Sequence, residues 1–222
     1  HMVAHVIIRF GTAAQKAHLL PRILTGEIFF CQGYSEPGAG SDLASLQMAA
    51  VADGDELILD GSKIWTTHAT EANWIFCLVR TNNAGKPQQG ITFLLVEMDS
   101  PGIEVRPILM TSGEHVQNQI FFDGVRVPRA NILGEVDQGW SVAKYLLEFE
   151  RGGSYAPALR VRLDEIAAAA VDRADDPLFG ARLSELRIRV DVLEMMEWRL
   201  LSASAGSSVG ALASMLKILG TE

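Results

Sequence analysis

A glycine-rich turn gives the strongest local signal and reads Tyr34-Ser35-Glu36-Pro37-Gly38-Ala39-Gly40-Ser41-Asp42. It follows directly on the β-prone run Ile28-Phe29-Phe30-Cys31. Glycines let a ligand approach the backbone, and successive amides can form a nest that binds anions. In such a site Ser41 would donate to a phosphate and Ser35 to a ring heteroatom. An ordinary strand-turn-helix corner would use the same residue types, so at this point both interpretations stay open.

Around this turn the sequence has a β texture from Ile28 to Gly134. Gly, Pro, Asn and Asp separate five β-prone runs: Ile28–Cys31, Leu57–Leu59, Trp74–Val79, Ile91–Val96 and Gln119–Phe122. The pairs Asp53-Gly54 and Asp60-Gly61 tolerate positive φ between runs and favour tight turns over long crossovers. We therefore expect a central antiparallel β-barrel or sandwich rather than a parallel sheet.

Helical periodicity flanks the β segment on both sides. Apolar residues recur at helical spacing from Ala13 to Ile23, and again from Trp140 onward in steps of three and four. The stretch Asp175-Asp176-Pro177 predicts a break between two long helical segments. The fold class predicted is α+β, with a helical part over residues 1–26, a β-barrel over 27–135 and a partial helical bundle over 136–222.

Composition limits the function. The 222 residues carry 19 basic and 27 acidic side chains, a net charge of −8, and no basic run, which disfavours nucleic-acid binding. The most apolar stretches, such as Ile166–Val171, are far shorter than the ~20 residues that span a bilayer. Cys31 and Cys77 each lie within an apolar run, as expected of buried thiols in a reducing compartment, either a cytoplasm or an organelle matrix.

Several common catalytic motifs are missing from the sequence. Gly38-Ala39-Gly40 lacks the third glycine of a dinucleotide fingerprint, and no P-loop occurs. No histidine stands in a group of three His, Cys or acidic ligands at zinc spacing, so we expect no metal site. A second cluster, Lys63-Ile64-Trp65-Thr66-Thr67-His68, does offer chemistry. Strand alternation places Trp65 and Thr67 on one side, where they could cover a flat conjugated ring or simply pack in a β-core.

Taken together, four ordered motifs closely resemble the acyl-CoA dehydrogenase family. They are Cys31 to Leu46, Asp60 to Thr67, Phe121 to Pro128 (Phe-Phe-Asp-Gly-Val-Arg-Val-Pro) and Gly134 to Trp140 (Gly-Glu-Val-Asp-Gln-Gly-Trp). The similarity runs from about Phe10 to Glu222. In that family this region comprises the end of the N-terminal helical domain, the middle β-barrel and the opening helices of the C-terminal domain. We therefore expect the sequence to be part of a longer protein.

The resemblance implies a flavoprotein that binds FAD and oxidises the Cα–Cβ bond of an acyl-CoA substrate to a trans-2-enoyl-CoA. Electrons would pass to an electron-transfer flavoprotein, and the full-length protein would form a homo- or hetero-tetramer in a bacterial cytoplasm or a mitochondrial matrix. Two other possibilities remain: a non-catalytic subunit of a heteromeric assembly, and a flavin oxidase or monooxygenase on the same fold. For the 222-residue chain alone we expect weak or no FAD retention and no turnover.

Site residues follow from the resemblance position by position. Contacts to flavin and its phosphates are implied for Tyr34, Ser35, Gly40 and Ser41, with Trp65 and Thr67 covering the isoalloxazine. Ser41 would also face the substrate. Ser35 stands where many members carry threonine, a departure that keeps the hydroxyl group.

The catalytic base is implied less directly. Most members place this glutamate late in the C-terminal domain, but a minority place it on the first helix after the barrel, where Glu150 precedes Arg151 here. We expect Glu150 to be the base and Arg151 to contact substrate. The alternatives are a base beyond residue 222 and a surface role for Glu150. Glu148 is a weaker candidate, because Lys144 and Arg151 can pair with it on the helix surface.

One departure from the family pattern concerns the pyrophosphate. Many members carry R-x-x-F on a later helix, and its arginine grips the FAD of a neighbouring subunit. This sequence has Asp176-Pro177-Leu178-Phe179 instead. An acid cannot replace a residue that binds an anion. Either this subunit does not supply that contact or a different partner chain completes the site.

Overall fold

The computed structural model describes residues 2–150, 154–173, 175–202 and 210–221. It has two compact units, His1–Leu146 and Leu147–Glu222, and its elements confirm the predicted α+β class. The helices are α1 (Met2–Phe10), α2 (Ala13–Leu24), α3 (Gly139–Glu150), α4 (Ala156–Ala169), α5 (Pro177–Ser202) and α6 (Gly210–Thr221). The strands are β1 (Phe30–Gly33), β2 (Ala49–Asp53), β3 (Glu56–Thr67), β4 (Trp74–Arg80), β5 (Ile91–Glu97), β6 (Ile103–Ile108) and β7 (Gln117–Pro128). The division at residues 26 and 135 stays a prediction.

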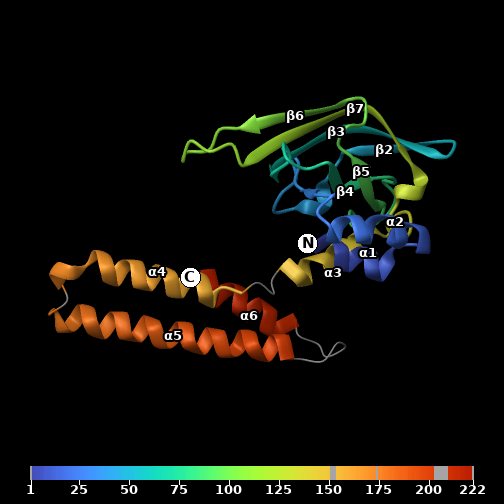
Figure 1. Cartoon of the computed structure of the whole chain (residues 1–222). Coiled ribbons are helices and arrows are strands. Elements are labelled where there is room, and N and C mark those ends of the chain that lie inside the picture. The colour runs from blue at the N-terminus through green and yellow to red at the C-terminus, as the bar shows by residue number, and fades with distance from the viewer. Residues whose placement is uncertain (1, 151–153, 174, 203–209, 222) are drawn as a thin grey trace. The chain divides into compact units, whose positions relative to one another are not determined.

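The seven strands form one curved sheet that resembles half of a barrel (Figure 1). Its order is β1-β4-β2-β3-β7-β6, with β5 on the other side of β4. Most strand pairs are antiparallel, as predicted, but the sheet is mixed, because β1 and β2 both run parallel to β4. The residues between β1 and β2 form the glycine-rich turn and the short helix Leu43–Ser45, and they bring the chain back to β4 in the same direction. This turn is therefore a crossover between two strands parallel to β4.

Strands β4 and β5 are buried along almost their whole length. Ile75, Cys77 and Val79 face the main apolar core. On the opposite face, Phe76 stacks on Phe93 at 5.7 Å between ring centroids. Because both faces are covered, these strands read as continuous apolar runs instead of alternating ones. Cys31 and Cys77 are free and buried in this layer, as predicted.

The pairs Asp53-Gly54 and Asp60-Gly61 differ in role. Asp53-Gly54 lies at the tight turn between β2 and β3, as predicted. The same prediction for Asp60-Gly61 is wrong, because the pair forms an irregularity inside β3, where the pairing with β7 shifts register. Gly61 has φ 143°, and a Cβ there would lie 2.9 Å from the Cα of Met48. A close approach between two backbones, and not a chain reversal, therefore explains this glycine.

The helices of the first unit begin and end at recognisable signals. Thr12 and Gln15 form a capping box at the start of α2, and Gly26 follows its end with φ 77°. Helix α3 starts at Gly139, where the chain passes so close to β5 that a Cβ would lie 2.3 Å from the backbone nitrogen of Phe93. The Gln15 amide also donates to the carbonyls of Ala130 and Ile132, both at 2.8 Å, and so ties α2 to the segment that follows β7. Helices α1 and α2 lie next to each other in Figure 1.

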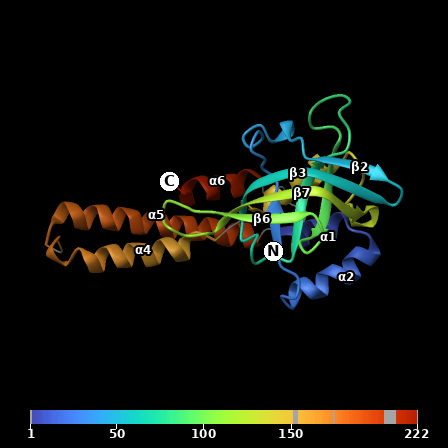
Figure 2. The same ribbon diagram turned by 90° about the horizontal axis from the view of Figure 1, so that it is seen from above.

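In the second unit α4 and α5 lie side by side, as Figures 1 and 2 both show. A small core of Ala156, Leu163 and Val190 joins them. Helix α5 begins at Pro177, which confirms the predicted break in the helical region. Within the described ranges no helix combines the length and apolarity needed to cross a membrane.

Candidate functional site

The glycine-rich turn folds back on itself immediately after β1. The backbone N–H groups of Glu36 and Ala39 each donate to the other's carbonyl, at 2.8 and 3.0 Å. A Cβ built on Gly38 or on Gly40 would meet no heavy atom within 4 Å, and neither residue has a positive φ. The described part of the chain gives no packing or conformational reason for these two glycines. Their open backbone suits the close approach of a ligand.

The predicted contact residues of this turn lie at different depths. Tyr34 is buried, with its ring edge-on to Phe76 at 5.8 Å and to Phe93 at 6.3 Å. Ser35 is partly buried, whereas Gly40 and Ser41 are exposed at the end of the turn. The tyrosine therefore anchors the turn in the barrel wall, and the exposed residues present backbone and hydroxyl groups outward.

The second predicted cluster forms an irregularity near the end of β3. Pairing with β7 shifts register between Lys63 and Thr66. Trp65 lies there with φ 60°, a left-handed conformation that is strained for a bulky side chain, and its side chain is 58% exposed. Thr67 is also exposed, and its hydroxyl accepts a hydrogen bond of 3.0 Å from the Gln117 amide. An exposed indole beside a hydroxyl can cover the face and edge of a flat ring.

The structure brings the two clusters together. The backbone N–H of Ile64 donates to the carbonyl of Ser35 over 2.9 Å. Directly before Ile64, the ammonium group of Lys63 reaches the carbonyl of Tyr34 at 3.3 Å and the carboxylate of Glu36 at 2.8 Å. Two stretches about thirty residues apart in the sequence are thus joined directly in the first unit.

Sequence reasoning did not assign a role to Lys63 or Glu36. Lys63 has no exposed surface, and burial lowers the pKa of its ammonium group, an effect that the neighbouring Glu36 carboxylate opposes. The signal available in the sequence was a lysine followed directly by the apolar residues Ile64 and Trp65. Without the fold, nothing in the sequence shows that Glu36 lies opposite it.

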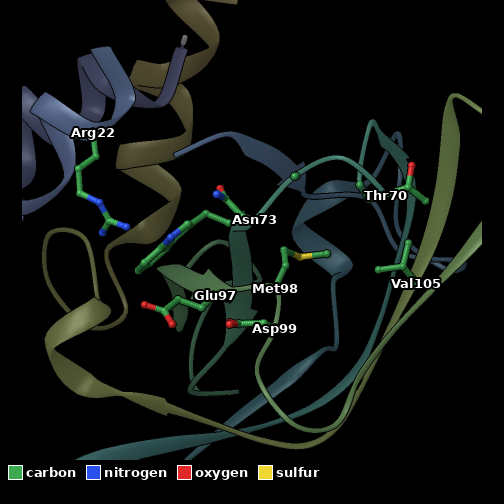
Figure 3. Close-up of a pocket in the computed structure, with 10 residues that line it drawn as sticks. Arg22, Thr70, Asn73, Glu97, Met98, Asp99 and Val105 are labelled. Carbon is green, nitrogen blue, oxygen red and sulfur yellow. The ribbon is translucent and has the colours of Figure 1, made fainter. Parts of the chain in front are cut away.

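A cavity of about 280 Å³ adjoins the turn and is lined in part by Glu36, Gly38 and Ser62. A larger one, of about 560 Å³, lies elsewhere in the first unit (Figure 3). Arg22, Asn73 and Glu97 are among its lining residues, and none of the predicted site residues is. Arg22 is already paired with Glu27 at 2.7 Å, and the Asn73 amide holds the backbone of Glu27 and Phe29. Two of the polar residues that line this cavity, Arg22 and Asn73, are therefore already engaged in contacts within the chain.

The predicted base belongs to the second unit. Glu150 is the last residue of α3, and its carboxylate lies 3.0 Å from the ammonium group of Lys217 on α6. Both side chains are partly exposed. Arg151, the predicted substrate contact, lies outside the described residues. The catalytic role of Glu150 stays a prediction, because the second unit is defined separately from the first.

The departure at Asp176 has a structural explanation. Its carboxylate accepts hydrogen bonds from the backbone N–H groups of Leu178 and Phe179 at 2.9 and 3.3 Å, at the start of α5. It also pairs with Arg173 at 2.7 Å. A carboxylate at this point satisfies free amides of the first helical turn and complements the helix dipole. In this chain the acid is a helix cap.

Comparison with known proteins agrees with this geometry. Residues 31–125 match the family described as "Acyl-CoA dehydrogenase, middle domain". The chain is 40% identical over 188 residues to acyl-CoA dehydrogenase IpdE1 of Mycobacterium tuberculosis, which covers 82% of this chain and 49% of IpdE1. The chain spans about half the length of such curated relatives.

Two solved structures are similar over nearly the whole chain. A structure titled Tcur3481-Tcur3483 steroid ACAD has a TM-score of 0.89 and 33% identity, covering 99% of this chain and 58% of that chain. The ChsE4-ChsE5 complex from Mycobacterium tuberculosis has a TM-score of 0.87 and 35% identity, covering 99% and 59%. The half-barrel with its flanking helices is the fold of acyl-CoA dehydrogenases. The chain belongs to the acyl-CoA dehydrogenase family.

Proposed function

We propose that the full-length protein is an FAD-dependent dehydrogenase that converts an acyl-CoA thioester to its trans-2-enoyl-CoA and passes electrons to an electron-transfer flavoprotein. The observation that supports this most is the hydrogen bond between Ile64 and Ser35, which joins the two candidate cofactor segments. Because the chain covers about half of its curated relatives, the proposal concerns the full-length protein.

The residues present fit FAD. The exposed indole of Trp65 offers an apolar plane for a flat ring, and the nearby Thr67 offers a hydroxyl for its polar edge. Gly38 and Gly40 leave the backbone of the turn open, and Ser41 can donate to a phosphate oxygen. When bound, flavin supplies the acceptor for the hydrogen that leaves Cβ with its electron pair.

The task of the chain's own carboxylate is proton transfer. We assign the α-proton of the thioester to Glu150, whose side chain is partly exposed at the end of α3. Loss of this proton from Cα and of a hydride from Cβ leaves a Cα–Cβ double bond. Lys217 lies 3.0 Å from this carboxylate in the described chain and must release it for the reaction.

A second candidate function is a subunit of a two-chain assembly in which the partner supplies part of the FAD site. The observation that favours it is Asp176, which caps α5 in place of the family's arginine. Two similar solved structures carry titles that name two chains, Tcur3481-Tcur3483 and ChsE4-ChsE5. In this assembly the chain either keeps its own Glu150 chemistry or acts as a non-catalytic partner.

The deciding experiment is the visible spectrum of the purified full-length protein under anaerobic conditions, titrated with acyl-CoA thioesters. One similar structure is titled a steroid ACAD, so the panel includes thioesters of steroid acids beside straight and branched chains. We expect one thioester to bleach the flavin band, and Glu150→Gln to keep FAD but abolish bleaching. Glu148→Gln, on the same helix, is the matched control and should retain activity. A protein that stays colourless with added FAD would overturn the dehydrogenase proposal and favour the non-catalytic subunit.

A further inference from the structure

We propose that Lys63 and Glu36 form a positioning pair that fixes the glycine-rich turn relative to Trp65, so that the two halves of the cofactor site stand at the right spacing before any ligand binds. This inference rests on the proposed function in naming FAD as the ligand. Both residues act through their neighbours and not through contact with the ligand.

The ammonium group of Lys63 has three donors and meets three acceptors. These are the carbonyl of Tyr34 at 3.3 Å, the carboxylate of Glu36 at 2.8 Å and the carbonyl of Leu78 at 2.6 Å. The acceptors come from the turn after β1 and from β4, while Lys63 itself comes from β3. One buried side chain therefore ties together three separate segments, and its hydrogen-bonding capacity is fully used.

Glu36 extends the connection to the far end of the turn. Its carboxylate accepts from the backbone N–H groups of Gln47 at 2.7 Å and Met48 at 3.0 Å, in addition to Lys63. The residue also closes the small turn with Ala39 through two backbone hydrogen bonds. The stretch from Tyr34 to Met48, which contains every predicted contact residue of the turn, is thus held at its start and at its end.

Stability alone does not account for this pair. The side chains are 0% and 9% exposed, and a buried ion pair of this kind is no more stabilising than apolar residues of the same volume. Two residues after Lys63, however, Trp65 adopts a strained φ of 60° with its indole exposed. Such strain persists where the surrounding structure over-determines it, and it gathers at ligand sites. The pair lies where the backbone of Trp65 must be fixed.

The test separates positioning from stability with three variants of the full-length protein: Lys63→Met, Glu36→Gln and the double variant. Lys86→Met, at an exposed lysine of the same unit, is the matched control. Each is measured for thermal stability, for the FAD dissociation constant, and for the ¹⁹F NMR spectrum after incorporation of 5-fluorotryptophan. Trp65→Phe assigns the Trp65 resonance, and Trp198, on α5, serves as an internal reference.

We expect the single variants to lose stability and the double variant to regain most of it, because no uncompensated charge is left buried. The double variant should still bind FAD at least about tenfold more weakly, and its Trp65 resonance should shift or broaden while that of Trp198 stays unchanged. Control values should match the wild type.

A double variant that is stable, binds FAD like the wild type and keeps the Trp65 resonance would overturn the positioning role. Failure of the double variant to fold would also overturn it, because the pair would then be a requirement of the fold itself. A wild-type protein that binds no FAD would instead refute the proposed function. The Trp65 resonance would still decide the role of the pair in that case.

Discussion

At the scale of single residues, three non-glycine residues have a positive φ: Trp65, His68 and Asp137, within the part of the chain that the structure describes. Asp137 is secured by its own polar groups, since its carboxylate accepts from the Thr81 hydroxyl and its N–H donates to Thr92. Trp65 has an apolar, exposed side chain that cannot compensate in this way. Its conformation therefore depends on the segments that hold its backbone, as proposed for Lys63 and Glu36, and strain of this kind gathers at ligand sites.

The glycines give a prediction in which binding and stability separate. Gly38→Ala places a methyl group in open space at an ordinary φ, so the free energy of unfolding should stay within about 1 kcal/mol of wild type. FAD affinity of the full-length protein should nevertheless fall, because the methyl group blocks the approach to the backbone. Fluorescence titration with FAD and a urea melt measure the two quantities.

Gly139→Ala is the opposite case and serves as the reference for that experiment. Its Cβ would lie 2.3 Å from the backbone nitrogen of Phe93, which cannot move aside. We expect a loss of about 1–3 kcal/mol in stability from overpacking. If Gly38→Ala proved as destabilising as Gly139→Ala, the turn would be a packed structural corner, and the ligand interpretation of its glycines would fail.

Asp176 leads to a prediction about pH. The hydrogen bond from Arg173, with those from backbone N–H groups, lowers the pKa of this carboxyl. A lowered pKa in the folded state contributes stability above the unfolded pKa, and that stability is lost as the pH falls through the folded value. Asp176→Asn should therefore be less stable than wild type near neutral pH, and the difference should shrink below pH ~4. Thermal melts across this range test it, and a difference independent of pH would contradict the assignment.

At the scale of elements, β3 shows what the sequence could and could not predict. Its apolar residues Leu57–Leu59 marked a strand, but the strand continues to Thr67 through two irregularities that break the alternation. Strand β6 was missed because its residues are mostly exposed or half-buried and include a proline. Helical spacing from Ala13 to Ile23 marked α2, and Asp175-Asp176-Pro177 marked the break before α5, and there the predictions are confirmed. Local signals in the sequence therefore predicted single elements, whereas the pairing of strands that lie far apart in the sequence could not be predicted.

The packing of α4 on α5 depends on one buried carboxylate. Glu197 of α5 accepts hydrogen bonds from the backbone N–H groups of Tyr155 and Ala156 and from the Ser154 hydroxyl, at the start of α4. Glu197→Leu should leave these donors unsatisfied and cost about 2–3 kcal/mol. Hydrogen exchange of the Tyr155 and Ala156 amides should speed up more than that of the α5 amides. Equal acceleration everywhere would mean that the substitution acts by global unfolding alone.

At the scale of the whole molecule, α5 carries apolar residues on two opposite faces. One face packs on α4 with Val190 among its buried residues. The other presents Ile188, Val192 and Met195, spaced by four and three, and all three are more than half exposed. Exposed apolar stripes of this kind associate with other surfaces.

We therefore expect the 222-residue chain to self-associate in a concentration-dependent manner. Met195→Lys should shift sedimentation velocity profiles toward the monomer with little change in thermal stability, because the side chain is exposed. Val161→Lys, which adds the same charge to an exposed residue of α4, is the control. A monomer at all concentrations would show that the stripe does not associate.

As with the fold, part of the candidate site could be predicted from the sequence and part could not. Its two surface clusters could be found from residue types and from family resemblance, because glycines, hydroxyls and an aromatic ring are visible in the sequence. The buried connection through Lys63 and Glu36 could not be found, since it depends on which strands lie next to each other. The relation of Glu150 to those clusters depends on how the two units meet.

The buried layer formed by β1 and β4 has a practical consequence for probing this protein. Burial raises the pKa of Cys31 and raises that of Cys77 to about 12, so at neutral pH neither forms the thiolate that reacts with maleimides. These are the sole cysteines of the chain. A cysteine introduced at exposed Asp42 would therefore be the one site that accepts a dye or spin label in the folded state. The wild-type chain therefore contributes no reactive thiol of its own to distance measurements between pairs of introduced cysteines.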